Sequence, residues 1–175
     1  MNVTVPLFLD TIEKTNFSTW LRESDSLFGF YFILAVHTLG LAMLVGPNAA
    51  IDLRLLGFGR EIPIAPMKKW FKIMWWGLGI NTVTGVLLFW AYPTKAATNL
   101  DFYIKLLCIG LAVWIVYRLK THVLGDTSLS EAAMEASGKT LAGWSLFLWF
   151  AAILAGRLLA YTYTWILYGQ YSPGG

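Results

Sequence analysis

Long apolar stretches, separated by short polar connections, dominate this chain. The longest run without a charged side chain extends over residues 26–51, and its segment 27–46 reads LFGFYFILAVHTLGLAMLVG. About twenty apolar residues, rising about 1.5 Å each along a helix, cross a hydrocarbon layer of about 30 Å. Similar stretches lie at about residues 73–92, 102–123 and 141–161. We therefore predict four membrane spans.

The spans are expected to be helices, because a backbone in lipid must satisfy its own hydrogen bonds and an open sheet edge cannot. Short connections favour sequential antiparallel helices in one bundle. Residues 48–58 can prolong the first helix beyond Pro47. The predicted fold is all-α, an integral membrane four-helix bundle that forms a single domain over residues 1–175.

The N-terminal segment 3–22 mixes apolar and charged residues at roughly helical spacing. Its apolar members are Leu7, Phe8, Ile12, Phe17, Trp20 and Leu21. This pattern predicts an amphipathic helix lying at the membrane interface. A loosely ordered tail anchored by Trp20 is the alternative.

Composition supports the membrane assignment and disfavours several classes of function. Hydrophobic residues make up 57% of the chain and charged residues 13%, against about 25% charged in soluble domains. The basic residues lie near span ends rather than in a patch with aromatic residues, so no nucleic-acid partner is expected. There is no Walker loop, no Gly-x-Ser-x-Gly elbow and no spacing of Cys and His that suits zinc. We expect no catalytic activity of its own.

Lysine and arginine residues predict the orientation. The first and third connection regions carry eight of them, whereas the N-terminal segment and the second connection region carry four. Because cytoplasmic loops are enriched in these residues, the first and third connections are expected inside and both termini outside.

His37 is the ionisable residue that lies deepest in the first span, and such a residue is costly in lipid. Counted from the outer ends of the spans, it lies about 15 Å deep, at the level of Asn81, Thr82 and Thr84. One interpretation is a structural histidine held by hydrogen bonds from these residues. The others are an axial ligand of a b-type haem, or a quinone, proton or metal site.

The haem interpretation assigns roles to further residues. His122 is a poor second axial ligand, because its depth differs from that of His37 by about 15 Å. Gly40, one turn from His37, would leave room for a flat macrocycle. Lys105 and Arg157, close to the outer face, could meet the propionates. Arg157 could equally extend to the lipid headgroups as an anchor.

Asp52 and Arg54 carry opposite charges two residues apart. On a helix such residues do not face each other. Each is therefore expected to pair across the inner surface in a structural role.

Several motifs resemble those of a domain-of-unknown-function family of small bacterial membrane proteins. The matching segments are WLRES (20–24), HTLGLAMLVG (37–46), DLRLLG (52–57), TG (84–85), FYIK (102–105) and, within 148–161, LW followed by AGRLLAY. The resemblance implies a four-span protein of the bacterial inner membrane, and the lysine and arginine count then puts both termini in the periplasm. The resemblance singles out His37, Asp52, Arg54, Lys105 and Arg157 and supplies no activity.

Two functions follow as hypotheses. The first is a redox-linked membrane component that holds a b-type haem through His37 and exchanges electrons with a redox partner. The second is a cofactor-free accessory subunit of a larger membrane complex, in which nine tryptophans and small-residue faces contact protein and lipid. Both place the chain in a lipid bilayer.

Overall fold

The computed structural model describes residues 6–23, 26, 29–126 and 128–162, and within these ranges every regular element is a helix. Four helices are long, and they are α3 (Phe30–Leu55), α4 (Trp70–Ala91), α6 (Leu100–Arg118) and α7 (Glu131–Tyr161). The short elements are α1 (Leu7–Glu13), α2 (Asn16–Glu23), α5 (Pro93–Ala97), the 3-10 helix η1 (Ala65–Lys69) and the π-helical turn η2 (Leu119–Val123). The predicted all-α class is confirmed.

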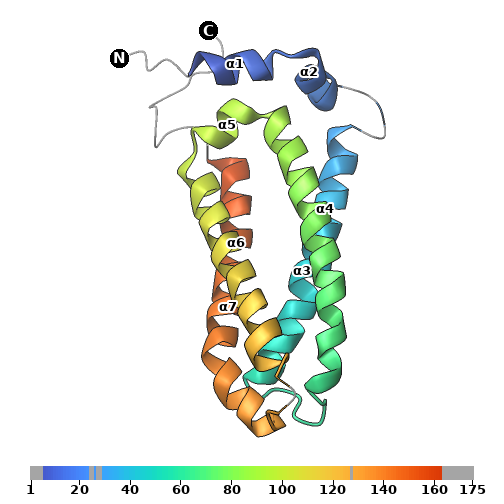
Figure 1. The fold of residues 1–175 in the computed structure, drawn as a ribbon. Coiled ribbons are helices and arrows are strands. Elements are labelled where there is room, and N and C mark those ends of the chain that lie inside the picture. Colours follow the sequence, from blue (N-terminus) through green and yellow to red (C-terminus); the bar gives the residue numbers. More distant parts are fainter. Residues whose placement is uncertain (1–5, 24–25, 27–28, 127, 163–175) are drawn as a thin grey trace.

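All four long helices are long and apolar enough to cross a membrane. They run lengthwise in alternating directions (Figure 1). Helix α3 continues through Pro47 to Leu55, as the sequence predicted. Helix α7 begins about ten residues earlier than the predicted span 141–161, where the Ser130 hydroxyl accepts a hydrogen bond from the Ala133 N–H. The chain is a multi-pass integral membrane protein.

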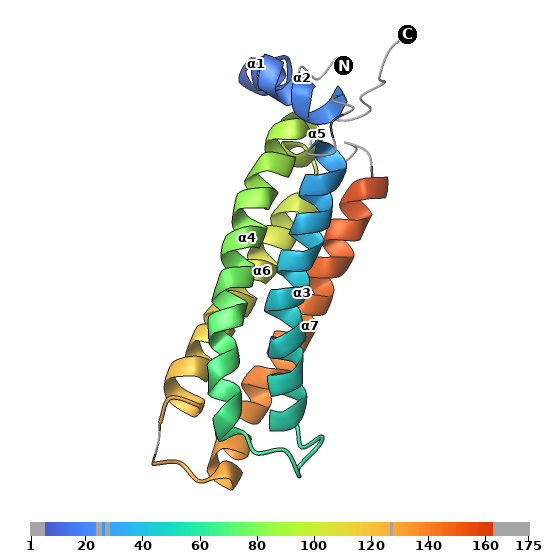
Figure 2. The ribbon, with the colours of Figure 1, turned by 90° about the vertical axis from the view of Figure 1, so that its right-hand side faces the viewer.

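The bundle consists of two antiparallel pairs, α3 with α4 and α6 with α7, which meet mainly through α3 and α7 (Figures 1 and 2). Two glycines set the close approach of the first pair. A Cβ atom on Gly77 would lie 2.8 Å from the Gly40 carbonyl oxygen, and one on Gly40 would lie 3.1 Å from the Gly77 carbonyl oxygen. Neither position can carry a side chain at this helix spacing.

The hydrophobic core lies toward one end of the bundle. We call this the η1 end, and the opposite end, where α1, α2 and α5 lie, the α5 end. The large buried cluster takes its members from the second half of α3, the η1 region, the first turns of α4, the end of α6 with η2, and the first two thirds of α7; they include Ile51, Leu55, Met74, Leu119 and Trp149. A smaller cluster of Leu21, Ile33 and Ala91 lies at the α5 end. The two pairs are thus held together chiefly at the η1 end.

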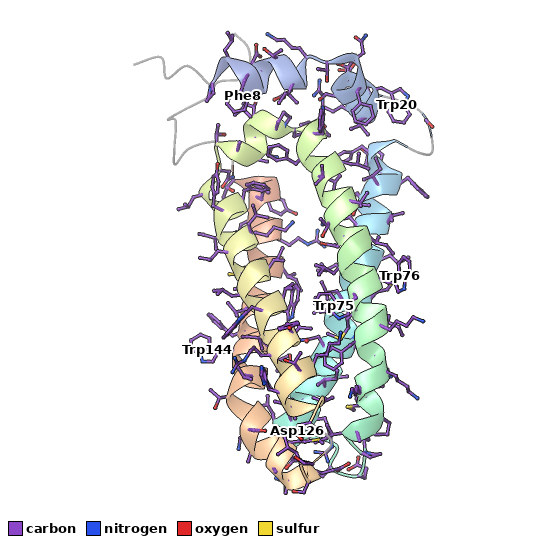
Figure 3. All side chains as sticks on the ribbon, in the orientation of Figure 1. Phe8, Trp20, Trp75, Trp76, Asp126 and Trp144 are labelled. Carbon is purple, nitrogen blue, oxygen red and sulfur yellow. The ribbon has the colours of Figure 1, made fainter. Side chains whose placement is uncertain are left out.

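Helices α1 and α2 lie across the α5 end of the bundle (Figure 1). Of the predicted interfacial helix 3–22, residues 3–5 lie outside the described residues, and the rest forms two helices rather than one. Arg22 donates to the Ala91 carbonyl oxygen at 2.8 Å and the Ser18 hydroxyl donates to that of Trp90 at 3.0 Å, which satisfies carbonyls at the end of α4. Phe8 and Trp20 stay exposed (Figure 3). The segment is helical, so the alternative of a loosely ordered tail is wrong.

Candidate functional site

The imidazole of His37 is hydrogen-bonded to helix α4. Its Nδ1 lies 2.9 Å from Oγ1 of Thr84, and the direction of this bond depends on the tautomer of the ring. The Thr84 hydroxyl has backbone acceptors of its own, the carbonyl oxygens of Ile80 at 2.7 Å and Asn81 at 3.3 Å. When the single hydroxyl proton is donated to one of these carbonyls, the Thr84 oxygen accepts from Nδ1–H of His37. The lone pair of the neutral ring is then on Nε2.

Nε2 of His37 has no hydrogen-bond partner within the described part of the chain. The histidine is half-buried, so this nitrogen is not closed off by packing. A neutral imidazole with one nitrogen hydrogen-bonded and the other free is the form that binds metal centres. His37 thus presents a Lewis base inside a membrane helix.

Asn81 fixes the backbone at the same level. Its amide Nδ2 donates to the His37 carbonyl oxygen at 2.8 Å, and both Asn81 and Thr84 are buried. Thr82 lies on the exposed side of α4, and its hydroxyl donates to the Leu78 carbonyl oxygen at 2.8 Å. Of the three polar residues expected near His37, Asn81 and Thr84 contact it and Thr82 does not.

Two glycines near His37 have different roles. A Cβ atom on Gly85 would lie 3.4 Å from Cε1 of His37, so the ring lies against a helix surface that has no side chain. A Cβ atom on Gly40 would lie 2.9 Å from Cγ2 of Ile80. Gly40 was expected to leave room for a macrocycle, and this expectation is wrong, because α4 fills the space beside it.

Lys105 approaches His37 from the other helix pair. Its charge acts on the imidazole electrostatically. The side chain is half-buried and lies over Gly156 of α7, where a Cβ atom would be 3.6 Å from Cδ and 3.7 Å from Nζ of Lys105. The glycine therefore leaves space for the lysine stem against the surface of α7.

The other two candidates lie apart from this pair. Arg157 is exposed and makes no hydrogen bond or ion pair with the described residues. His122 is exposed in η2, at the opposite end of the bundle. The structure thus brings His37, Thr84, Asn81 and Lys105 together and leaves Arg157 and His122 outside.

A second polar group is buried between α3 and α7. Nδ2 of Asn48 lies 2.5 Å from Oδ2 of Asp52 and 2.7 Å from Oγ of Ser145. All three residues are at most 1% exposed. Oδ1 of Asn48 and Oδ1 of Asp52 have no partner among the described residues. The prediction that Asp52 pairs across the inner surface is wrong, because the carboxyl group is inside the bundle and its neighbours are neutral.

Arg54 does make the predicted ion pair across the bundle end. Its guanidinium bonds to Glu135 and Glu131 of α7, and Nε donates to the Ile62 carbonyl oxygen at 2.5 Å. Only 4% of the residue is exposed. Arg54 therefore ties α7 and the loop before η1 to the end of α3.

Sequence reasoning missed Asn48, Ser145 and Gly85. The spacing of Asn48 and Asp52, four residues apart, could have placed the first two polar groups on one helix face. Nothing in the sequence identifies Ser145 or Gly85, because each acts through a residue of another helix.

The described residues contain no group of three or more His, Cys, Asp or Glu side chains that could hold a bare metal ion. A haem differs in this respect, because the macrocycle supplies four nitrogen ligands and the protein needs to add only one or two.

Comparison of the chain with protein-family models, with curated proteins and with solved structures finds no match. The resemblance to a family of small bacterial membrane proteins stays a prediction.

Proposed function

We propose that this integral membrane protein is a redox-linked component that binds a b-type haem through Nε2 of His37. The observation that carries the proposal is the 2.9 Å hydrogen bond between Nδ1 of His37 and the Thr84 hydroxyl. With Nδ1 as the donor in that bond, the lone pair of the ring is on Nε2, and axial histidines use the same arrangement of one bound and one hydrogen-bonded nitrogen. A haem would supply reversible one-electron chemistry there.

The surrounding residues fit one axial ligand and one anion contact. Lys105 brings a cation toward His37 from α6, which suits a propionate. His37 lies in the half of the bundle away from the large hydrophobic cluster. No second histidine reaches this level in the described residues, so we expect one protein ligand and an accessible sixth position.

The proposal includes an orientation in a bacterial inner membrane. The η1 end carries eight lysine and arginine residues in its two connection regions, against four in the N-terminal segment and the second connection region. This asymmetry supports a cytoplasmic η1 end and periplasmic termini. His37 would then lie in the half of the bundle nearer the periplasm, where a periplasmic redox partner could reach it.

A haem titration of the purified protein in detergent tests the proposal. We expect wild-type protein to bind one haem per chain with a Soret band distinct from that of haem in detergent alone. His37→Ala should lose this band, and His122→Ala should keep it, because His122 is exposed at the opposite end. A folded wild-type protein that binds no haem would contradict the proposal and favour the accessory-subunit hypothesis.

A further inference from the structure

An open cavity of about 600 Å³ lies at the η1 end of the bundle, between the two helix pairs. Its wall includes Lys68 and Lys69 of η1, Lys72 of α4 and Lys120 of η2, together with Trp75 and Trp76. Three of these lysines are close in the sequence, but Lys120 comes from the far side of the cavity, about fifty residues later in the chain. The fold therefore gathers four cations around one opening.

No acidic side chain lines the cavity. None of the four lysines forms an ion pair within the described residues. Nζ of Lys120 lies 5.5 Å from the centre of the Trp75 ring, which holds this cation over the cavity wall. The cavity thus has a concentrated positive charge and no internal anion to balance it. A phosphate group would balance this charge, because its oxygens accept charge-assisted hydrogen bonds from several ammonium groups at once.

The position of the cavity favours an amphiphilic ligand. Its lysines lie at the start of the predicted membrane-spanning stretch of α4, whereas Trp76, 66% exposed, lies farther along that helix. Figure 3 shows Trp76 on the outer side of α4, away from α6. A lipid whose phosphate occupies the cationic part could place its acyl chains along this apolar surface.

We propose that this cavity binds the phosphate headgroup of an anionic phospholipid. The four lysines contact the phosphate oxygens, and the acyl chains run along α4 beside Trp76. This site is separate from His37 and does not depend on haem binding. Lipid binding in the cavity would anchor the η1 end of the bundle in the surrounding lipid leaflet.

Native mass spectrometry of the full-length protein tests the proposal. The protein is titrated in neutral detergent with phosphatidylglycerol, and with phosphatidylcholine as the zwitterionic control. We expect phosphatidylglycerol to bind more tightly, and Lys72→Gln and Lys120→Gln each to weaken its binding about fivefold. Lys120→Arg should retain binding, and so should Lys139→Gln, whose exposed side chain on α7 does not line the cavity.

Equal binding of the two lipids would overturn the proposal. So would an equal loss of phosphatidylglycerol binding in Lys139→Gln and Lys120→Gln. Full displacement of the lipid by inorganic phosphate would also overturn it, since the site would then recognise a soluble anion.

Discussion

Nδ1 of His37 lies 2.9 Å from the hydroxyl oxygen of Thr84, and this hydrogen bond joins helix α3 to helix α4 in the membrane interior. The same hydroxyl lies 2.7 Å from the Ile80 carbonyl oxygen, which can accept its proton. When it does, the Thr84 oxygen accepts from Nδ1–H, and Nε2 of the neutral imidazole carries the lone pair. The proposed haem site uses this arrangement, in which Nε2 is the nitrogen that binds the ligand.

Replacing Thr84 by valine keeps the shape of the side chain and removes the acceptor. We expect Thr84→Val to lower haem affinity by about tenfold or more, because the imidazole loses the bond that fixes its orientation. Thr82→Val is the matched control, since Thr82 also donates to its own helix but is exposed. Haem titration of both variants measures the effect. Equal affinities would show that the Thr84 hydroxyl does not position the ligand.

Asp52 is buried without a cation, so its charge is not needed to hold the fold. We expect Asp52→Asn to leave the melting temperature in detergent unchanged or to raise it, because an amide of the same shape replaces a carboxyl group that lacks an ion-pair partner. Asp52→Ala should destabilise the protein by about 1–3 kcal/mol, since the Asn48 amide then loses an acceptor. A loss of stability in Asp52→Asn as large as that in Asp52→Ala would indicate a cation bound to the carboxylate.

Arg54 is the ionic link between the end of α3 and the start of α7. Arg54→Gln should lower the free energy of unfolding by about 2 kcal/mol, between the values for exposed and for fully buried pairs. The side chains of Glu131 and Glu135 are 47% and 24% exposed, so solvent screens part of the loss. Thermal unfolding in detergent measures it. A melting temperature equal to that of the Lys139→Gln control would contradict the proposed role.

Gly77 and Gly46 provide a matched test of the close contact between α3 and α4. A Cβ atom added to Gly77 would lie 2.8 Å from backbone atoms of α3, whereas one added to Gly46 would have no other atom within 4 Å. Gly77→Ala should therefore destabilise the bundle, despite the better helix propensity of alanine. Gly46→Ala should be neutral or stabilising by up to about 1 kcal/mol. Equal thermal stability of the two variants would mean that the helices are not held at this spacing.

The orientation is open to a direct test with reporter fusions. Fusions at residues 62 and 129 should report the cytoplasm, and fusions after residue 97 and at the C-terminus should report the periplasm, because lysine and arginine are concentrated at the η1 end. The opposite pattern would place His37 nearer the cytoplasm.

The long apolar stretches predicted the four spans, because each segment must by itself be long and apolar enough to cross the lipid. The continuation of α3 through Pro47 was also predicted from local sequence, namely from residues 48–58. The early start of α7 was not, since residues 131–140 are a polar helical extension, although Ser130 followed by Glu131 is a recognisable helix start. The short helix α5 also carries a local signal, Pro93 at its first position.

The candidate site was predictable only in part. Counting residues from the span ends correctly placed Asn81 and Thr84 at the level of His37, because straight helices of similar length keep their registers. The same count could not tell which face of α4 each residue occupies, so it did not separate Thr82 from Thr84. It also could not show that Gly40 packs against Ile80, since helix rotation is determined by contacts with a neighbouring helix.

Chemical rescue of His37→Gly tests the central claim most directly. Removing the side chain leaves a space in which free imidazole can take the place of the ring, while the rest of the bundle keeps its own contacts. We predict that wild-type protein binds haem, that His37→Gly does not, and that imidazole added to the variant restores haem binding and its Soret band. Equal haem binding by wild type and His37→Gly in the absence of imidazole would contradict the assignment of His37 as the ligand.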